Sequence, residues 1–378
     1  MHEQSTALGA CPSDAHRSLR AAATRYVAAI QAEIYLDRLL YAFVGFYVLA
    51  IWLASVLIGD SSKFRPFLYV SPTLSMSASS LLLILAAPAV SAIAIAIQRN
   101  PSAPLSELLC IIRSVVGPRV VTGTLLLTMI GVFYGTFTSA KNMLPDVFHS
   151  HWDTSLAKAD RLISGGIDPS AILMAIQGDN LTILSLVYGA AWHVLVFGLT
   201  ALVAVSRSHD YVRKQFLLAT LMCWVLVGNI LAATFYSGGP SFYDLFTGDS
   251  TRFSVLAKSI PAVTLAEQSY LRDFFRAGEI GIGSGISAFP SMHVTAATLV
   301  AFLLRSINRR LSWLGIAFVA LIEIGSIRLG WHYAIDGYVG VCSAAIAWWV
   351  AGKINAHKPR ARAIPGTISA AIAVQSKM

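Results

Sequence analysis

Two short stretches in the last third of the chain combine histidines with an acid, an arginine and a run of glycines. His293 closes the first stretch, residues 285–293, and His332 lies in the second, residues 326–336. Each stretch stands at the edge of an apolar segment long enough to cross a bilayer. Ionisable side chains at such positions are costly to bury, so both stretches are candidates for function.

The second stretch contains a nucleophile and its partner at helical spacing. His332 and Asp336 are four residues apart, so on one helical face the carboxylate can hold a ring N–H and fix the tautomer. The other ring nitrogen is then free to attack. His293 would serve as the general acid toward the leaving oxygen. Arg328, on the same helical face, would bind phosphate oxygens through its planar fork.

The first stretch suits a phosphate at a helix end. Pro290 can begin a helix, because its missing N–H would have no partner there. Ser291 and His293 then fall in the first turn, where free backbone N–H groups favour a phosphate oxygen. The hydroxyl of Ser291 adds a donor, and the glycines before it allow close approach of the backbone. No Gly-Lys-Ser/Thr ending follows, which excludes a nucleotide-binding P-loop.

The composition indicates a membrane protein. Of 378 residues, 56% are apolar and only 12% are charged, which is too apolar for an ordinary soluble domain. The chain is therefore predicted to be all-α, a polytopic membrane helix bundle of about eight transmembrane helices. The predicted segments are residues 39–59, 78–97, 120–139, 181–205, 216–235, 290–304, 311–327 and 334–351.

The basic residues predict the orientation of the bundle. The short, strongly basic loops all fall on the side of both chain termini, which we expect to be cytoplasmic. The long loops, residues 140–180 and 236–289, and both motif stretches then face the periplasmic or extracellular side. The net charge of +9 is not gathered into one basic patch, so no nucleic-acid partner is expected.

The chain divides into three predicted parts. Residues 1–119 form an N-terminal extension with two transmembrane helices and an amphipathic, interfacial piece at 105–116. Residues 120–352 form a catalytic six-helix membrane core, and residues 353–378 form a cytoplasmic tail. The four cysteines are scattered, which indicates neither a disulfide framework nor a zinc site.

One further cluster in the loop at 140–180 has two interpretations. His149, His151 and Asp153 have a spacing at which alternate side chains can converge on a metal ion. The alternative is an amphipathic interfacial helix over 156–163, with Trp152 at headgroup level. No third histidine or cysteine follows closely, which favours the second interpretation. No metal and no cofactor are expected.

Together the two stretches resemble a known group of enzymes. Ser-Ala-Phe-Pro-Ser-Met-His at 287–293 and Gly-Trp-His-Tyr-Ala-Ile-Asp at 330–336 resemble the second and third signature motifs of the type-2 phosphatidic acid phosphatase superfamily. Met292 and Tyr333 make them most similar to its inositol phosphorylceramide synthase branch. The resemblance implies a six-helix core and metal-independent chemistry through a phosphohistidine. In that scheme His332 is the nucleophile, Asp336 its orienting acid, and His293 the acid and later the base.

Two features depart from the phosphatases of this group. Their first motif, a lysine and an Arg-Pro that grip phosphate, is missing. Gly239, Pro240 and Tyr243 resemble the segment that the branch carries in its place, which implies a role in substrate binding. The family's third-motif arginine stands six residues before the histidine, where this chain has Ser326, whereas Arg328 stands four residues before it.

These features lead to one expected function and two alternatives. We expect a membrane phosphotransferase that moves a phosphoryl-bearing headgroup from a lipid to a lipid or polyol acceptor, or to water. The reduced positive charge of the motifs favours a phosphodiester, with one negative charge, over a phosphomonoester. The first alternative is a lipid phosphate or isoprenyl diphosphate phosphatase. The second is a non-catalytic lipid-binding or transport protein that has kept the scaffold.

Overall fold

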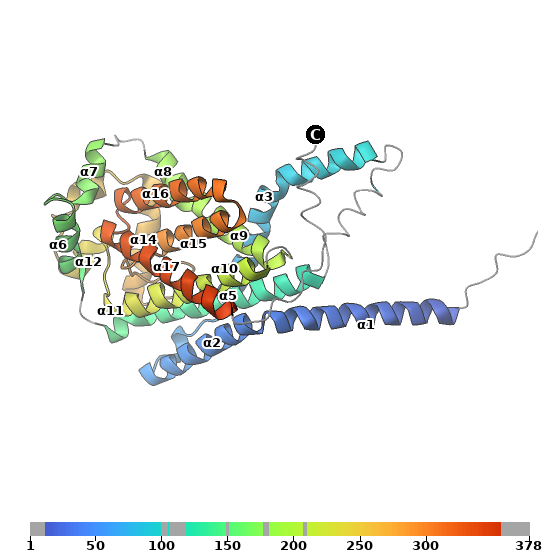
Figure 1. Cartoon of the computed structure of the whole chain (residues 1–378). Helices are drawn as coiled ribbons and strands as arrows, with labels where there is room; N and C mark the ends of the chain where they lie inside the picture. Colours follow the sequence, from blue (N-terminus) through green and yellow to red (C-terminus); the bar gives the residue numbers. More distant parts are fainter. Residues whose placement is uncertain are drawn as a thin grey trace, which may run out of the picture.

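Helices make up all the regular structure that is described in this chain. The computed structural model describes residues 12–99, 105, 118–148, 151–176, 181–206 and 210–356, and over these residues it contains helices and turns but no strand. The long helices form a bundle, and the short helices α6, α7 and α12 gather at one end of it (Figure 1). The prediction of an all-α, polytopic helix bundle is confirmed.

Most of the long helices are apolar, and the short helices either lie in the loops or continue a long helix. The long helices are α1 (Pro12–Leu36), α2 (Arg38–Ile58), α3 (Val70–Arg99), α5 (Pro118–Val147), α9 (Trp192–Val205), α10 (Asp210–Val225), α14 (Ala262–Ala277), α15 (Met292–Ile307), α16 (Ser312–Arg328) and α17 (Ala334–Ala356). The short helices are α6 (Asp153–Ile163), α7 (Pro169–Ile176), α8 (Thr182–Leu186), α11 (Ala232–Thr234), α12 (Tyr243–Thr247) and α13 (Ser254–Lys258). Wide π-turns join α8 to α9 and α10 to α11.

Six helical segments of the described chain are long and apolar enough to cross a membrane. They are α2, α5, α8–α9, α10–α11, α16 with the turn before it, and α17, and each coincides with a predicted segment. The other two predicted segments fall on shorter apolar helices, Val70–Ala86 within α3 and Met292–Ile307. The length and apolar character of these helices identify an integral membrane protein.

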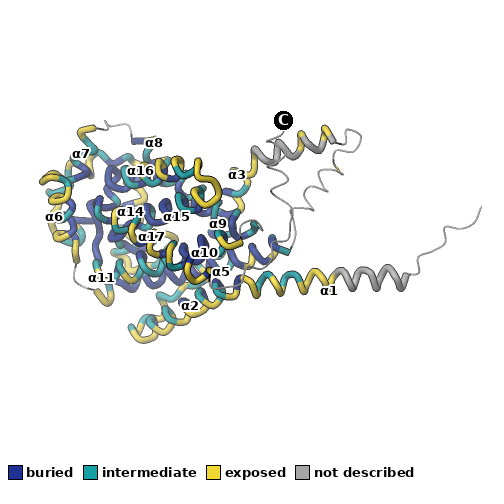
Figure 2. Tube along the Cα trace, in the orientation of Figure 1, coloured by how far each residue is buried: buried dark blue, intermediate teal, exposed yellow. Residues whose placement is uncertain are grey.

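The helix that carries His293 lies at the centre of the bundle. α15 packs against α9, α10, α16 and α17, and its inward face is buried from Val294 to Leu303 (Figure 2). Gly315 of α16 lies so close to Ala301 that a Cβ atom would come within 2.6 Å of the Ala301 Cα. Gly340 of α17 lies equally close to Ser291 and Thr295. Small residues at these crossings let the backbones approach and fix the two histidine-bearing regions relative to each other.

Buried ion pairs attach the N-terminal helices to the rest of the bundle. The carboxylate of Asp37, between α1 and α2, accepts hydrogen bonds from both terminal guanidinium nitrogens of Arg213, each at 2.7 Å. Arg119, at the start of α5, contacts Asp37 at 3.2 Å and Glu33 at 2.6 Å. Arg119 and Arg213 are therefore fixed inside the protein.

The predicted boundaries at residues 119 and 352 stay predictions. The amphipathic piece and the C-terminal tail lie outside the described residues, except for Leu105 and residues 353–356.

One predicted boundary was wrong in a way that bears on function. The first core segment was expected to end at residue 139 and to give way to a loop, but α5 continues to Val147. The helix continues because its polar residues are accommodated inside the protein. The amide of Asn142, for example, donates to the Thr138 carbonyl oxygen and to the Ser284 hydroxyl. Lys141 consequently belongs to a helix of the bundle.

Candidate active site

His332 lies in the tight turn between α16 and α17. The backbone N–H groups of Trp331 and His332 both donate to the Ser326 carbonyl oxygen, at 3.0 and 3.1 Å, so the turn folds back onto the end of α16. Gly330 has a φ of +76°, a conformation that favours glycine. A helical face shared by Arg328, His332 and Asp336 was expected, and that expectation was wrong, because α16 ends at Arg328 and α17 begins only at Ala334.

The histidine and the acid meet across this turn nonetheless. The Nδ1 atom of His332 lies 3.3 Å from the Asp336 carboxylate and 2.8 Å from the backbone carbonyl oxygen of Ala288. Both neighbours are hydrogen-bond acceptors, so Nδ1 carries the proton and donates to them. The Nε2 atom of the neutral ring then carries the free electron pair. This is the protonation state that a nucleophilic histidine requires.

Asp336 links the two motif stretches. Its side chain is fully buried, and its carboxylate also accepts the backbone N–H of Tyr333 at 3.0 Å. Its own backbone carbonyl oxygen accepts the N–H of Ser291 at 3.0 Å. Because one residue contacts the His332 ring and the start of α15, the stretches at 285–293 and 326–336 are held as one unit.

His293 lies in the first turn of α15, in a sandwich of aromatic rings. Its ring stacks on Tyr188 at a centroid distance of 4.5 Å and packs against Trp192 at 4.3 Å. The indole N–H of Trp192 donates to the His293 carbonyl oxygen. The rings of His293 and His332 are 6.4 Å apart, centroid to centroid. This separation leaves room for a phosphoryl group between the two side chains.

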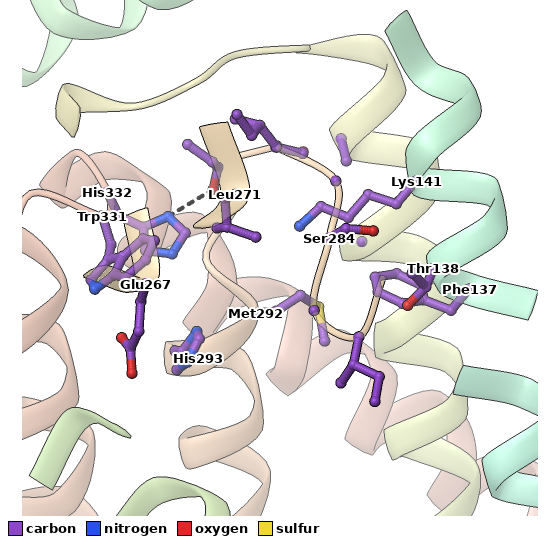
Figure 3. Close-up of a pocket in the computed structure, with 18 of the residues that line it drawn as sticks. Phe137, Thr138, Lys141, Glu267, Leu271, Ser284, Met292, His293, Trp331 and His332 are labelled. Carbon is purple, nitrogen blue, oxygen red and sulfur yellow. Dashed lines mark hydrogen bonds between the residues drawn. The ribbon is translucent and has the colours of Figure 1, made fainter. Parts of the chain in front are cut away.

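Both histidines line a cavity of about 700 Å³. Most of its wall is apolar and aromatic, and includes Tyr134, Phe137, Trp192, Phe197, Trp224 and Trp331. Among the described residues that line it, Lys141 is the only lysine or arginine and Glu267 the only acid. Lys141 reaches from α5 with its amine directed toward the side of the cavity where the histidines lie (Figure 3). Its stem packs on Gly285, where a Cβ atom would meet it at 3.0 Å.

A family model describes the region that holds this site. The model of the PAP2 superfamily matches residues 154–350, which include both histidines and Asp336. The chain belongs to the PAP2 superfamily. Proteins of this superfamily are generally phosphatases and phosphotransferases, and a membrane member acts on lipid or other phosphate-ester substrates. The searches of curated proteins and of solved structures gave no match.

In this PAP2 protein, five residues predicted to bind substrate are described, and none of them lines the cavity. The Ser291 hydroxyl caps α15 by accepting the N–H of Val294 at 3.4 Å. Pro290 precedes this cap, so the expected helix start at Pro290 was two residues too early. Arg328 is 1% exposed, and its Nη1 donates to the Ser259 hydroxyl at 2.9 Å.

The other three lie behind the cavity wall. The Gly239 N–H donates to Asp153, Pro240 begins a short 3₁₀ turn, and the Tyr243 ring packs in an apolar cluster. Their contact with substrate, like that of Ser291 and Arg328, stays a prediction.

The loop at 140–180 contains the helix expected there. α6 spans Asp153–Ile163, but its buried face packs on the protein itself. His149 lies outside the described residues, and the His151 ring packs against Tyr236 and Phe246. Both Asp153 carboxylate oxygens accept hydrogen bonds from the protein. Within the described parts of the chain, no three His, Cys, Asp or Glu residues form a metal-type cluster.

Sequence reasoning missed two charged residues of the cavity. The sequence does contain a signal for Lys141, since a lone lysine in an apolar helix is a functional candidate, but the helix was expected to end before this residue. Glu267 left none, because it lies among other charged residues of α14. Partial burial raises the pKa of Glu267 above its ordinary value, and the neighbouring His193 opposes that shift.

Proposed function

We propose that this PAP2 protein is a membrane phosphotransferase that works through a phosphohistidine on His332. The observation that carries the proposal is the pair of acceptors at Nδ1, the Ala288 carbonyl oxygen at 2.8 Å and the Asp336 carboxylate at 3.3 Å. They leave the electron pair on Nε2, and His332 lines the cavity. The fixed tautomer supports His332 as the nucleophile and Asp336 as its orienting acid.

The proposed reaction has two displacements. In the first, Nε2 of His332 forms a bond to phosphorus as the bond from phosphorus to the leaving oxygen breaks, and His293 gives that oxygen a proton. In the second, His293 takes a proton from the acceptor hydroxyl, whose oxygen forms a new bond to phosphorus as the bond to Nε2 breaks. Every proton in the scheme moves through His293, and no step uses a metal.

The cavity wall supports a lipid as the substrate. Its aromatic surface suits acyl or isoprenyl chains, and the charge of Lys141 suits an ester with one negative charge. A phosphomonoester carries nearly two charges and would also meet Glu267. These charges favour a phosphodiester headgroup, and therefore transfer to an alcohol, as in the inositol phosphorylceramide synthase branch.

The path of the chain supports a site on the outer face. His293 lies in the first turn of α15 and His332 lies in the turn between α16 and α17, at the end of the bundle where α6 and α12 pack on both motif stretches. Arg309 and Arg310 lie at the other end, between α15 and α16. Basic loops favour the cytoplasm, so we place the termini inside and the cavity mouth on the periplasmic or extracellular side.

The test uses purified protein in detergent with chelator present. Labelled phosphatidylinositol, phosphatidic acid and an isoprenyl diphosphate are supplied, with and without ceramide or diacylglycerol, and the His332→Ala variant runs alongside. Label that moves to a new lipid only in the wild type supports the transferase. Release of inorganic phosphate supports the alternative, a lipid phosphate or isoprenyl diphosphate phosphatase.

Two further results would change the assignment. Equal activity in His332→Ala would exclude the phosphohistidine. No turnover on any substrate would favour the non-catalytic lipid-binding or transport protein.

A further inference from the structure

Helix α6 lies outside the cavity, yet two of its acids contact the residues that follow His332 and the loop at Gly238 and Gly239. Asp153 is 0% exposed and Asp160 is 4% exposed. A buried carboxylate normally needs strong hydrogen-bond or charged partners. Their partners are backbone N–H groups and one phenol, all of them in segments that frame the site.

Asp153 ties two separate loops together. Its Oδ2 accepts the N–H of Gly238 at 2.8 Å, and its Oδ1 accepts the N–H of Gly239 at 2.9 Å. Oδ1 also accepts the hydroxyl of Tyr333 at 2.9 Å. Gly238 lines the cavity and Tyr333 directly follows His332. One carboxylate therefore fixes the distance between the cavity wall and the histidine turn.

Asp160 caps the helix that follows His332. Its Oδ2 accepts the N–H of Ala334 at 3.1 Å, and its Oδ1 accepts the N–H of Ile335 at 2.9 Å. The first N–H groups of a helix have no partner within it, and a Ser, Thr, Asp or Asn just before the helix usually accepts them. Tyr333 precedes α17 and cannot do so. Asp160 supplies the missing acceptor from another helix.

Asp336 completes this capping arrangement. Its carboxylate accepts the Tyr333 N–H at 3.0 Å, as the acid of a capping box does. The same Oδ2 atom is the one near Nδ1 of His332. The cap of α17 and the orientation of the histidine thus depend on one carboxylate, and Asp160 holds the turn that presents it.

The apolar face of α6 keeps both acids in place. Leu156 and Ala157 are buried in one cluster with Phe289 of the first motif stretch and Tyr333 of the second. Loss of either acid would consequently leave the helix packed and affect mainly the hydrogen bonds.

We propose that Asp153 and Asp160 are positioning residues for His332: they hold its turn so that Nε2 faces the cavity and the histidine is aligned with its substrate. The kinetic part of this inference rests on the proposed function. The structural part concerns only the His332 ring and is measured without turnover.

The experiment compares Asp160→Asn, Asp160→Ala, Asp153→Asn and Tyr333→Phe with Lys158→Gln. Lys158 is an exposed residue of α6, so its variant controls for a change on the same helix. The first readout is the rate at which diethyl pyrocarbonate modifies His332, located by peptide mass spectrometry in detergent-solubilised protein. The second is kcat and KM on whichever substrate the wild type turns over.

The expected results separate positioning from folding. His332 is 8% exposed, so a loosened turn raises its modification rate severalfold in all four acid-network variants. We expect kcat to fall about 10- to 100-fold with KM unchanged, since small misalignments have effects of that size. Asp160→Asn keeps one acceptor oxygen, so its kcat should fall less than the kcat of Asp160→Ala. Lys158→Gln should match the wild type in both readouts.

Two outcomes would overturn the inference. The first is a wild-type modification rate in folded Asp160→Asn, Asp153→Asn and Tyr333→Phe. The second is wild-type kcat in these variants while His332→Ala is inactive, which would leave the proposed function standing. If the wild type turns over no substrate, the proposed function fails, and the modification rate alone decides whether the acids position the ring. Should Asp160→Ala not fold, Tyr333→Phe, which removes a single hydroxyl, still decides the case.

Discussion

The imidazole of His332 donates from Nδ1 to the backbone carbonyl oxygen of Ala288, at 2.8 Å, and this bond is shorter than the 3.3 Å contact to Asp336. A carbonyl oxygen cannot be protonated near neutral pH, so it fixes the Nδ1–H tautomer independently of the acid. Ala288 belongs to one motif stretch and His332 to the other. The His332 ring is therefore oriented by the partner stretch as well as by its own.

The first prediction concerns Asp336→Asn. Because Ala288 keeps the tautomer, we expect kcat to fall by about 10- to 100-fold, through lost electrostatic support and alignment. His332→Ala should lose activity altogether. The measurement is kcat for the two variants on the same lipid. Equal inactivity would mean that the Ala288 carbonyl does not preserve the reactive tautomer.

The second prediction concerns Lys141, which lines the cavity. Lys141→Met removes the positive charge and should lower kcat/KM about 100-fold, a typical loss for one charged group that meets the transition state. Lys141→Arg keeps the charge and should retain part of the activity. Lys158→Met, on the exposed face of α6, is the matched control. Unchanged kinetics in Lys141→Met would show that the phosphate binds elsewhere in the cavity.

The third prediction concerns the aromatic sandwich around His293. Tyr188→Phe preserves the stacked ring and should leave kcat near the wild-type value. Tyr188→Leu removes the stack at 4.5 Å, so the His293 ring gains freedom and kcat should fall about tenfold as its alignment is lost. The ratio of kcat between these two variants is the measurement. A ratio near unity would contradict a role for the stack.

The fourth prediction concerns the stability of the fold at the end of the bundle opposite the cavity. Asp37→Asn leaves Arg213, which is 2% exposed, without its bidentate partner and should destabilise the fold by about 3–5 kcal/mol. Lys214→Met breaks an ion pair with the exposed Asp210 and should cost about 0–1 kcal/mol. Unfolding of both variants in detergent measures the difference. Similar losses would argue against a structural role for the buried pair.

The fifth prediction concerns pH. Burial raises the pKa of Asp160 above its ordinary 3.8. The N–H groups of Ile335 and Ala334 lower this pKa by donating to the carboxylate. The charges of Asp168 and Arg252 have smaller effects, which raise and lower the pKa respectively. The folded state then binds a proton that the unfolded chain has lost. The stabilisation from this bound proton is complete below the ordinary pKa of 3.8 and is lost as pH rises through the raised pKa of the folded state.

The measurement is the melting temperature in detergent at a series of pH values, from the ordinary pKa of 3.8 upward. The wild type should lose melting temperature with rising pH more steeply than Asp160→Asn, which has no titrating group at that position. Parallel curves for the two proteins would contradict the raised pKa.

The sequence determined the class of the protein and indicated the residues for which a role in catalysis is proposed. Uninterrupted apolar segments of this length leave few choices, because within a bilayer such a segment pairs its own backbone groups as a helix. The motif residues His293, His332 and Asp336 were found from type and spacing, and the structure brings all three together. The predicted contact between His332 and Asp336 exists, although it spans a turn and not the helical face that the spacing indicated.

Only the tertiary structure decided which residues surround the two histidines. Lys141 comes from α5 and Glu267 from α14, and nothing local to either residue reports that both line one cavity. The same limit explains Ser291 and Arg328, whose types suit phosphate but whose groups are used as a helix cap and a buried donor. Asp153 and Asp160 show it most clearly, since a carboxylate that accepts N–H groups from segments far along the chain leaves no periodic signal. Spacing specifies neighbours along one element, whereas a site is assembled from contacts between elements.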